Sequence, residues 1–411
     1  MPAADQSAMP AGRLIGGGHD QSAPTHVLRP LSHTFFIHPF VVDFGSSRPL
    51  VEYNEGMKDE LEKEVLCSTL FRKAGKHMNI EQYKASMDPE LRAGFVQMLP
   101  FFSNRPSDLI EARKFIEEML AAANAWQPKN DRVMVEDRSV PGPTGAPDVP
   151  VRIYTPVART GTLPGLLYIH GGGFTVGNLD TEDLSCRHIV EEVGCVVVSV
   201  DYRLAPEHTF PAAPEDCYAA LRWMAAHVEE LGIDPTRIGV RGGSAGGGLC
   251  AAVALMARDR KEVKLIFQMP LYGCLDDRHI TPSSHEIAAD DMIWGRPASL
   301  KGWEAYLGEN HRGDVSPYAA PARAADLSGL PPAYLCIGEL DLMRDENIKY
   351  ATRLMQAGVP TELHVYPGAF HGFEGLVPNA AVSIRAINEY TDALKRGLSR
   401  NLKDEGRIVQ S

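Results

Sequence analysis

The sequence lacks the closely spaced cysteine pairs that form zinc or redox sites. Its seven cysteines are an odd number, lie far apart and include no Cys-x-x-Cys: Cys67, Cys186, Cys195, Cys217, Cys250, Cys274 and Cys336. We therefore expect no metal site, and we expect most of these thiols to be small buried apolar groups in a reducing compartment.

Positive charge is also scarce. Among 411 residues there are 41 Lys and Arg against 53 Asp and Glu, which gives a formal net charge of -12. Because nucleic acids and anionic membranes bind basic patches, this balance argues against either of them as a partner.

Long hydrophobic runs are missing as well. Residues 1–24 have neither the basic region nor the apolar stretch of a signal peptide. The longest suspect run, residues 35–44, is short and is interrupted by His38 and Pro39. The sequence therefore predicts no membrane span and a cytoplasmic protein.

The N-terminal third of the chain differs in composition from the rest. Residues 1–30 are rich in Ala, Gly, Pro and Ser without periodic apolar positions, which is typical of a disordered tail. Residues 31–125 are interpreted as an extension with a helical region, whose apolar spacing predicts helices at 57–75, 88–99 and 107–126. The last of these helices is expected to be capped by Ser107, with Glu111 in its first turn.

Residues 126–411 show strands alternating with helices. Two strands around a Pro/Gly-rich turn indicate a hairpin, and six further strands follow between helices. This pattern predicts an α/β fold with a mostly parallel eight-stranded sheet and helices on both faces. The strands are expected at 131–140, 147–157, 165–170, 195–202, 237–243, 263–273, 333–341 and 361–367, and the helices at 214–232, from 245, at 345–358 and at 380–398.

A single serine lies in the glycine cluster at the end of the strand at 237–243. Ser244 is in the frame Gly-x-Ser-x-Gly, between that strand and the helix that starts at residue 245. Glycines two positions to either side let the chain turn sharply and expose the serine oxygen, as a nucleophile elbow requires. A phosphate-binding loop fits less well, because no Gly-Lys-Ser/Thr follows.

A second glycine cluster follows the strand at 165–170. His170 precedes Gly171, Gly172 and Gly173. Backbone amides aimed at a tetrahedral oxyanion are worth roughly 10²–10³-fold in rate each, and glycines let them approach a substrate without obstruction. We expect His170 to brace this loop by hydrogen bonds, and a flexible connecting loop is the alternative.

A serine nucleophile needs a base and an acid, which in this arrangement follow it along the chain. Of the downstream histidines, only His371 lies on a loop directly after a predicted strand; the others are His279, His285, His311 and His364. Asp341 comes just past another strand end and is the preferred acid over Glu339, Asp345 and Glu346.

These segments together resemble the hormone-sensitive lipase family of α/β-hydrolases, the serine esterases marked by His-Gly-Gly-Gly. The resemblance covers roughly residues 125–400 and rests on several motifs in the right order. They are HGGGFTVG, DYRLAPEHTFPAAPED, GGSAGGG, the segment at 316–346, and HGF.

The resemblance implies the α/β-hydrolase fold with a helical cap. The cap would consist of the helices before residue 130 and an insertion at about 274–311, whose aromatic residues Trp294, Trp303 and Tyr306 could line an acyl pocket. It also implies the absence of a cofactor, and a homodimer through the last strand and helix would suit the family.

The resemblance also assigns roles to residues. Ser244 would be the nucleophile, His371 the base and then the acid, and Asp341 the carboxylate that orients it. The oxyanion hole would consist of the amides of Gly172, Gly173 and Ala245, and Gly171 would shape the loop.

Two features depart from the family pattern. Gly243 precedes the nucleophile where family members commonly have Asp, Glu or Thr, so a local hydrogen bond is missing. The N-terminal extension is also longer than usual.

The motifs predict a hydrolase that cleaves small-molecule esters with short- to medium-chain acyl groups, through an acyl-serine and without a cofactor. Lactones, amides or carbamates are alternative substrates for the same triad. A non-catalytic receptor on this fold is a further alternative, but such receptors lose the catalytic histidine, and His371 is present.

Overall fold

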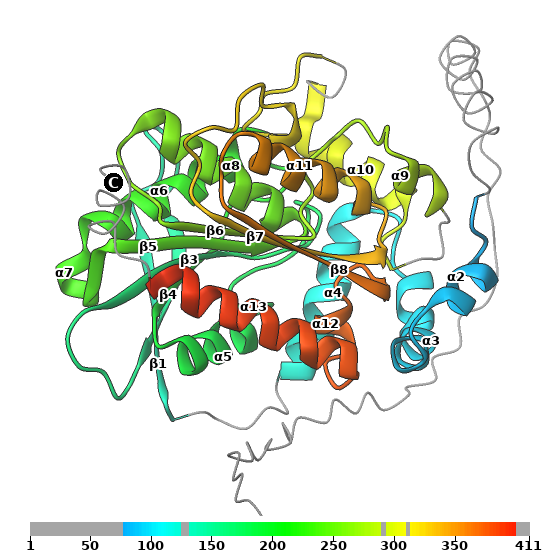
Figure 1. Cartoon of the computed structure of the whole chain (residues 1–411), viewed down its shortest axis with the longest axis horizontal. Coiled ribbons are helices and arrows are strands. Elements are labelled where there is room, and N and C mark those ends of the chain that lie inside the picture. Colours follow the sequence, from blue (N-terminus) through cyan, green and yellow to red (C-terminus); the bar gives the residue numbers. More distant parts are fainter. Residues whose placement is uncertain (1–76, 125–130, 289–292, 310–312, 400–411) are drawn as a thin grey trace, which may run out of the picture. The chain divides into compact units, whose positions relative to one another are not determined.

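One mixed sheet forms the centre of the computed structural model (Figure 1). The structure describes residues 77–124, 131–288, 293–309 and 313–399. The predicted tail over 1–30 and the predicted helix over 57–75 lie outside these residues. The proposed division of the chain near residue 125 stays a prediction.

The sheet has the strand order β1-β2-β4-β3-β5-β6-β7-β8. β1 and β2 form the predicted antiparallel hairpin, β2 is also antiparallel to β4, and the remaining neighbours are parallel. This confirms the predicted mostly parallel, eight-stranded sheet. The strands are β1 Val133–Val140, β2 Val149–Pro156, β3 Leu163–Ile169, β4 Val196–Val200, β5 Ile233–Gly243, β6 Phe267–Leu271, β7 Ala333–Leu340 and β8 Thr361–Phe370.

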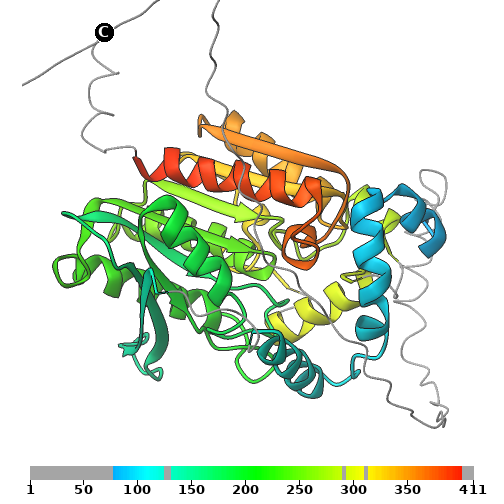
Figure 2. The same cartoon turned by 90° about the horizontal axis from the view of Figure 1, so that it is seen from below.

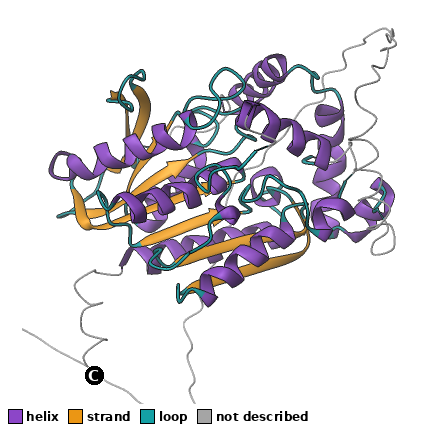
Figure 3. Ribbon diagram, turned by 90° about the horizontal axis from the view of Figure 1, so that it is seen from above, coloured by secondary structure: helices purple, strands orange, loops and turns teal. Residues whose placement is uncertain are grey.

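Helices cover both faces of the sheet, as predicted (Figure 3). α6 (Ala212–Ala226), α8 (Ala245–Arg260) and α11 (Arg344–Gln356) lie on one face, and α5 (Asp183–Val193) and α13 (Ala381–Ser399) lie on the other (Figure 1). Because both faces are covered, inner strands such as β4 are mostly apolar and are buried throughout.

Two helices differ from the prediction. α5 was not expected, because its sequence DLSCRHIVEEV is mostly polar and buries only Cys186, Ile189 and Val190. The helix expected at 214–232 is interrupted at His227, where α6 ends and the short α7 (Val228–Leu231) begins.

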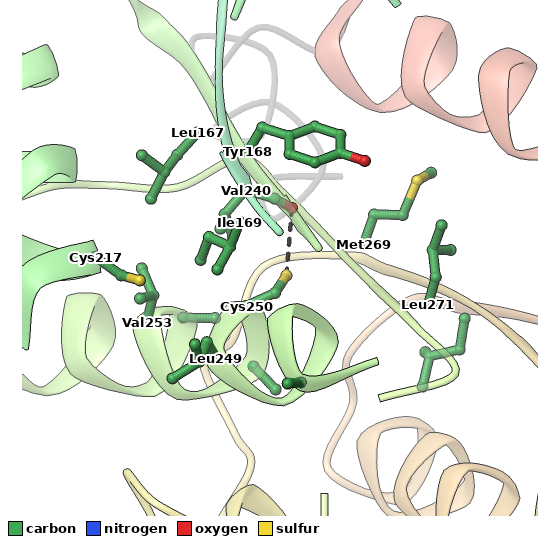
Figure 4. Packing of buried hydrophobic residues seen from close by; sticks show 14 of the residues in the cluster. Leu167, Tyr168, Ile169, Cys217, Val240, Leu249, Cys250, Val253, Met269 and Leu271 are labelled. Carbon is green, nitrogen blue, oxygen red and sulfur yellow. Dashed lines mark hydrogen bonds between the residues drawn. The ribbon is translucent and has the colours of Figure 1, made fainter. Parts of the chain in front are cut away.

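In the core, α8 packs on β5, β6 and β3 (Figure 4). Leu249 and Val253 of α8 are buried there, and the Cys250 thiol donates a hydrogen bond to the Val240 carbonyl oxygen at 3.5 Å. Of the seven cysteines, the six that the structure describes are buried and free, as expected from their scatter.

Cap helices gather at the end of the molecule where the parallel strands finish (Figures 1 and 2). In the part of the chain that the structure describes, three precede the sheet and two lie in the predicted insertion between β6 and β7. They are α2 Ile80–Ser86, α3 Pro89–Ser103, α4 Leu109–Asn124, α9 Pro282–Glu286 and α10 Arg296–Leu307. The structure also describes a 3-10 turn at Pro321–Arg323 and the short helix α12 (Phe373–Leu376). Among the described residues, no helix is long and apolar enough to cross a membrane.

The cap of α4 differs from the expectation of Ser107. The helix begins one residue later, and the Asp108 carboxylate accepts hydrogen bonds from the amides of Ile110 at 2.9 Å and Glu111 at 3.0 Å. An Asp at this position also interacts favourably with the positive end of the helix dipole, which a serine hydroxyl does not do as strongly.

α2 and α3 are fixed to the ends of β7 and β8. Phe95 of α3 is fully buried, with its ring 5.8 Å from that of Tyr83 and 5.5 Å from that of Phe370. The Tyr83 hydroxyl donates to the Leu340 carbonyl oxygen at 2.9 Å. Since Leu340 and Phe370 are the last residues of β7 and β8, this packing supports the chain just before Asp341 and His371.

We predict that Phe95→Ala lowers the free energy of unfolding by about 3–5 kcal/mol, because it leaves a cavity between α3 and Phe370. Urea unfolding of the purified variant measures this change. Val96→Ala is the matched control, because Val96 is 49% exposed, and its effect should be within about 0.5 kcal/mol. Equal stabilities for the two variants would contradict this docking of α3.

Candidate active site

Ser244 lies on a sharp turn between β5 and α8. Its backbone has φ 57° and ψ -122°, a conformation that residues other than glycine rarely adopt. A Cβ on Gly242 would come 2.1 Å from the Gly246 carbonyl oxygen, and one on Gly246 would come 2.2 Å from that of Ile169. The turn therefore requires glycine at both positions.

Hydrogen bonds fix the backbone of this serine to the next strand. The Ser244 amide donates to the Leu271 carbonyl oxygen at the end of β6, at 3.0 Å. The Ser244 carbonyl oxygen accepts from the amides of Gly248 and Cys274, each also at 3.0 Å. The strained conformation is thus imposed by the surrounding structure, as is common at functional sites.

The predicted serine, histidine and aspartate lie together at the carboxyl ends of the strands. His371 directly follows β8, and its Nε2 lies 2.9 Å from the Ser244 Oγ. Its Nδ1 lies 2.7 Å from Asp341 Oδ2, and Asp341 Oδ1 accepts from the Met343 amide at 2.9 Å. A histidine that donates from Nδ1 presents an acceptor at Nε2, so the Ser244 hydroxyl donates to it.

The other candidates of the same types have other partners. His364 lies inside β8 and contacts Glu362 at 2.8 Å. Glu339 accepts from the Gly368 amide, Asp345 from the Ser283 amide and Glu346 from the Leu275 amide.

Burial strengthens the electrostatics of the three residues. Asp341 is 1% exposed as a residue, and the His371 side chain is 11% exposed. Charge interactions are stronger where little water screens them. A carboxylate in this position stabilises a positive charge on the imidazole more than it would in water.

His170 braces the glycine loop, by which we mean residues 170–177. Its Nδ1 donates to the Gly171 carbonyl oxygen at 2.8 Å, and its ring stacks on Tyr202 with centroids 4.2 Å apart. The Tyr202 hydroxyl donates to the His170 carbonyl oxygen at 3.0 Å. Burial lowers the pKa of His170 to about 4, so its ring is neutral.

The glycine loop runs directly beside the serine. A Cβ on Gly171 would lie 3.5 Å from the Ser244 Cβ. Gly172 and Gly173 have φ values of 113° and 59°, which residues with a side chain rarely adopt. The amides of Gly172, Gly173 and Ala245 donate no hydrogen bond to any other residue that the structure describes.

The aromatic residues of the insertion have different surroundings. The Trp294 ring lies 6.1 Å from that of His371, and a Cβ on Gly173 would come 2.4 Å from it. Trp303 and Tyr306 are buried instead, and they pack against Phe174 of the glycine loop. Trp294 is thus the one of these three that borders His371.

Two residues beside the site were not predicted from the sequence. The rings of Tyr272 and His371 form a T-shaped pair with centroids 5.2 Å apart. The Tyr272 hydroxyl donates to Glu374 Oε1 at 2.5 Å. A Cβ on Gly243 would lie 3.0 Å from the Tyr272 hydroxyl oxygen, so the glycine before the nucleophile makes room for this tyrosine. Burial raises the pKa of Glu374.

Sequence signals for these two residues are weak. Glu374 lies only three positions after His371, which could have drawn attention to it, whereas Tyr272 and Glu374 are 102 positions apart. Cys274 is a further neighbour, with its Sγ 3.9 Å from the Ser244 Oγ. Within the described ranges, no group of three His, Cys, Asp or Glu side chains could hold a metal ion.

A family model described as "alpha/beta hydrolase fold" matches residues 166–375, which include the glycine loop, the elbow and the two strand-end residues. The chain belongs to this family. The fold class and the resemblance seen in the sequence are therefore confirmed.

Individual members of the family are similar over most of their length. "Esterase LipI" of Mycobacterium tuberculosis is 39% identical over 272 residues, 66% of this chain and 84% of that protein. "Carboxylesterase NlhH" of the same species is 41% identical over 271 residues, 64% and 83% of the two chains. The solved structure "Bacterial Heroin Esterase" is 46% identical, with a TM-score of 0.72 over 77% of this chain and 99% of that one.

We predict that His170 makes the protein less stable in acid. Its folded-state pKa of about 4 lies below the ordinary value of 6.5. Between these values the unfolded chain binds a proton that the folded chain does not, so the free energy of unfolding falls as the pH drops through this window.

Urea unfolding above and below the window, for the wild type and His170→Asn, measures this effect. Asparagine can still donate to the Gly171 carbonyl oxygen but does not titrate. The wild type should lose up to about 3 kcal/mol more than the variant on acidification. Equal losses would show that His170 is not the titrating group.

Proposed function

We propose that the chain is a carboxylic ester hydrolase for short- to medium-chain acyl esters, with Ser244, His371 and Asp341 as its catalytic triad. The observation that carries this proposal is the continuous hydrogen-bond line through the imidazole, 2.7 Å on the Asp341 side and 2.9 Å on the Ser244 side. Residues 126–411 would form the catalytic unit, with 31–125 and the insertion at 274–311 as its cap.

In the first half of the reaction, the Ser244 Oγ attacks the ester carbonyl carbon. His371 Nε2 takes the serine proton, and Asp341 stabilises the imidazolium that results. The carbonyl oxygen becomes an oxyanion, for which the amides of Gly172, Gly173 and Ala245 supply donors. The carbon–oxygen bond to the alcohol then breaks, the alcohol leaves with the proton from His371, and an acyl-serine remains.

In the second half, water takes the place of the alcohol. His371 Nε2 removes a proton from the water as its oxygen attacks the acyl carbon, and a second oxyanion forms at the same amides. The bond to the Ser244 Oγ breaks and the serine regains its proton from His371. The products are a carboxylic acid and the free enzyme, so every proton is accounted for within the site.

The names of the relatives favour esters as substrates, since these proteins are named esterases and carboxylesterases. The triad fixes acyl transfer rather than the acyl or alcohol group, so lactones, amides and carbamates would pass through the same steps. A receptor without catalysis is disfavoured by the intact His371 and its contact with Ser244.

We predict that the wild type releases p-nitrophenol from a series of acyl esters from acetate to dodecanoate, fastest with the short chains. Ser244→Ala and His371→Asn should each lower kcat by about 10⁴-fold or more, because removing a triad residue leaves only binding and oxyanion stabilisation. The chain length at which the rate drops reports the depth of the acyl pocket.

His364→Asn is the matched control, because His364 lies on the same strand as Phe370 but bonds to Glu362, away from the serine. It should keep the wild-type rate. If the wild type cleaved none of the esters, or if Ser244→Ala retained its rate, the proposed mechanism would be wrong. Binding of a small molecule by an inactive wild type would favour the receptor.

A further inference from the structure

The glycine loop is supported by side chains from the cap. Phe174, in the middle of the loop, has φ 65°, a strained value for a residue with a side chain. Its ring stacks on Tyr306 with centroids 4.1 Å apart and is tilted against Trp303 at 5.1 Å. Both aromatics belong to α10 of the insertion, so one cap helix holds the middle of the loop by apolar packing.

A second cap helix, α4, holds the same loop by polar contacts. Arg113 Nε donates to the Thr175 carbonyl oxygen at 2.6 Å, and its Nη2 donates to the Ala205 carbonyl oxygen at 2.8 Å. Both Nη atoms also donate to the carboxylate of Glu207 at 2.8 Å. The guanidinium is thus held in one orientation, because its planar set of N–H donors has acceptors on three sides.

One helical turn after Arg113, Glu117 lies on the same face of α4, because residues four positions apart share a helix face. Burial raises the pKa of the Glu117 carboxyl, and the positive charge of Arg113 and the backbone of Gly177 lower it. The polar contacts described between α4 and the loop are those of Arg113.

The contact at Thr175 reaches the glycines through the backbone. The Thr175 amide donates to the Gly172 carbonyl oxygen at 3.1 Å, and the Val176 amide donates to the same oxygen at 3.0 Å. The peptide that links Gly172 to Gly173 is therefore hydrogen-bonded to the segment of the loop that Arg113 contacts. Its N–H is the Gly173 amide, one of the proposed oxyanion donors.

We propose that Arg113 is a positioning residue for the proposed ester hydrolysis, on which this inference rests. It holds the glycine loop in register so that its amides point at the oxyanion. The N-terminal cap is then a working part of the catalytic site as well as a cover over it. Misplacing reacting groups by about 1 Å can cost 10²-fold in rate, so loosening this clamp should lower kcat.

Steady-state kinetics of the full-length chain with p-nitrophenyl butyrate test the proposal. Arg113→Met should lower kcat by about 10- to 100-fold with KM changed less than about threefold. Arg113→Lys, which keeps a donor but not the fork, should lose less than Arg113→Met.

An exposed neighbour on α4 provides the matched control. Lys114→Met removes the same charge one position further along the helix and should leave kcat and KM unchanged. Thermal unfolding of every variant separates a kinetic effect from a loss of fold, and Arg113→Lys carries the test if Arg113→Met does not fold.

The outcome that would overturn the proposal is a raised KM with unchanged kcat in folded variants of Arg113. That result would make α4 a wall of the substrate pocket and no more. Failure of the proposed function has a different signature, because the wild type itself would then show no turnover that depends on Ser244.

Discussion

The backbone turn at Ser244 is the constraint around which the rest of the site is built. The serine can leave the plane of β5 only because Gly242 and Gly246 leave space for the carbonyl oxygens packed against them. Hydrogen bonds to Leu271 and Cys274 then fix it at the carboxyl edge of the sheet. The parallel strands all end at this edge. A histidine directly after β8 and an aspartate directly after β7 are therefore placed near the serine by the sheet itself.

The architecture was predictable from the sequence because buried parallel strands have continuous apolar sequences that alternate with helices. The prediction failed where that signal is absent. α5 is largely polar and packs with three small or branched residues, so its pattern did not stand out. The cap of α4 was shifted by one residue, because Ser107 and Asp108 are adjacent and both are common cap residues; which one is used depends on where the helix starts.

The residues that we propose for chemistry were found from chain order and position at strand ends, and the structure brings Ser244, His371 and Asp341 within hydrogen-bond distance. Their neighbours could not be found in this way. Arg113 meets Thr175 across 62 positions, and Tyr272 meets Glu374 across 102. Such pairs follow no local periodicity, because they join segments that only the folded chain brings together.

Helix α10 belongs to the insertion between β6 and β7, yet its aromatic face packs on Phe174 of the glycine loop. Trp303 and Tyr306 are therefore supports of the loop, and Trp294 is the one of the three aromatic residues that borders His371. A smaller side chain at Trp303 or Tyr306 would remove packing that holds a left-handed phenylalanine in place. An engineer who alters α10 therefore alters the glycine loop as well.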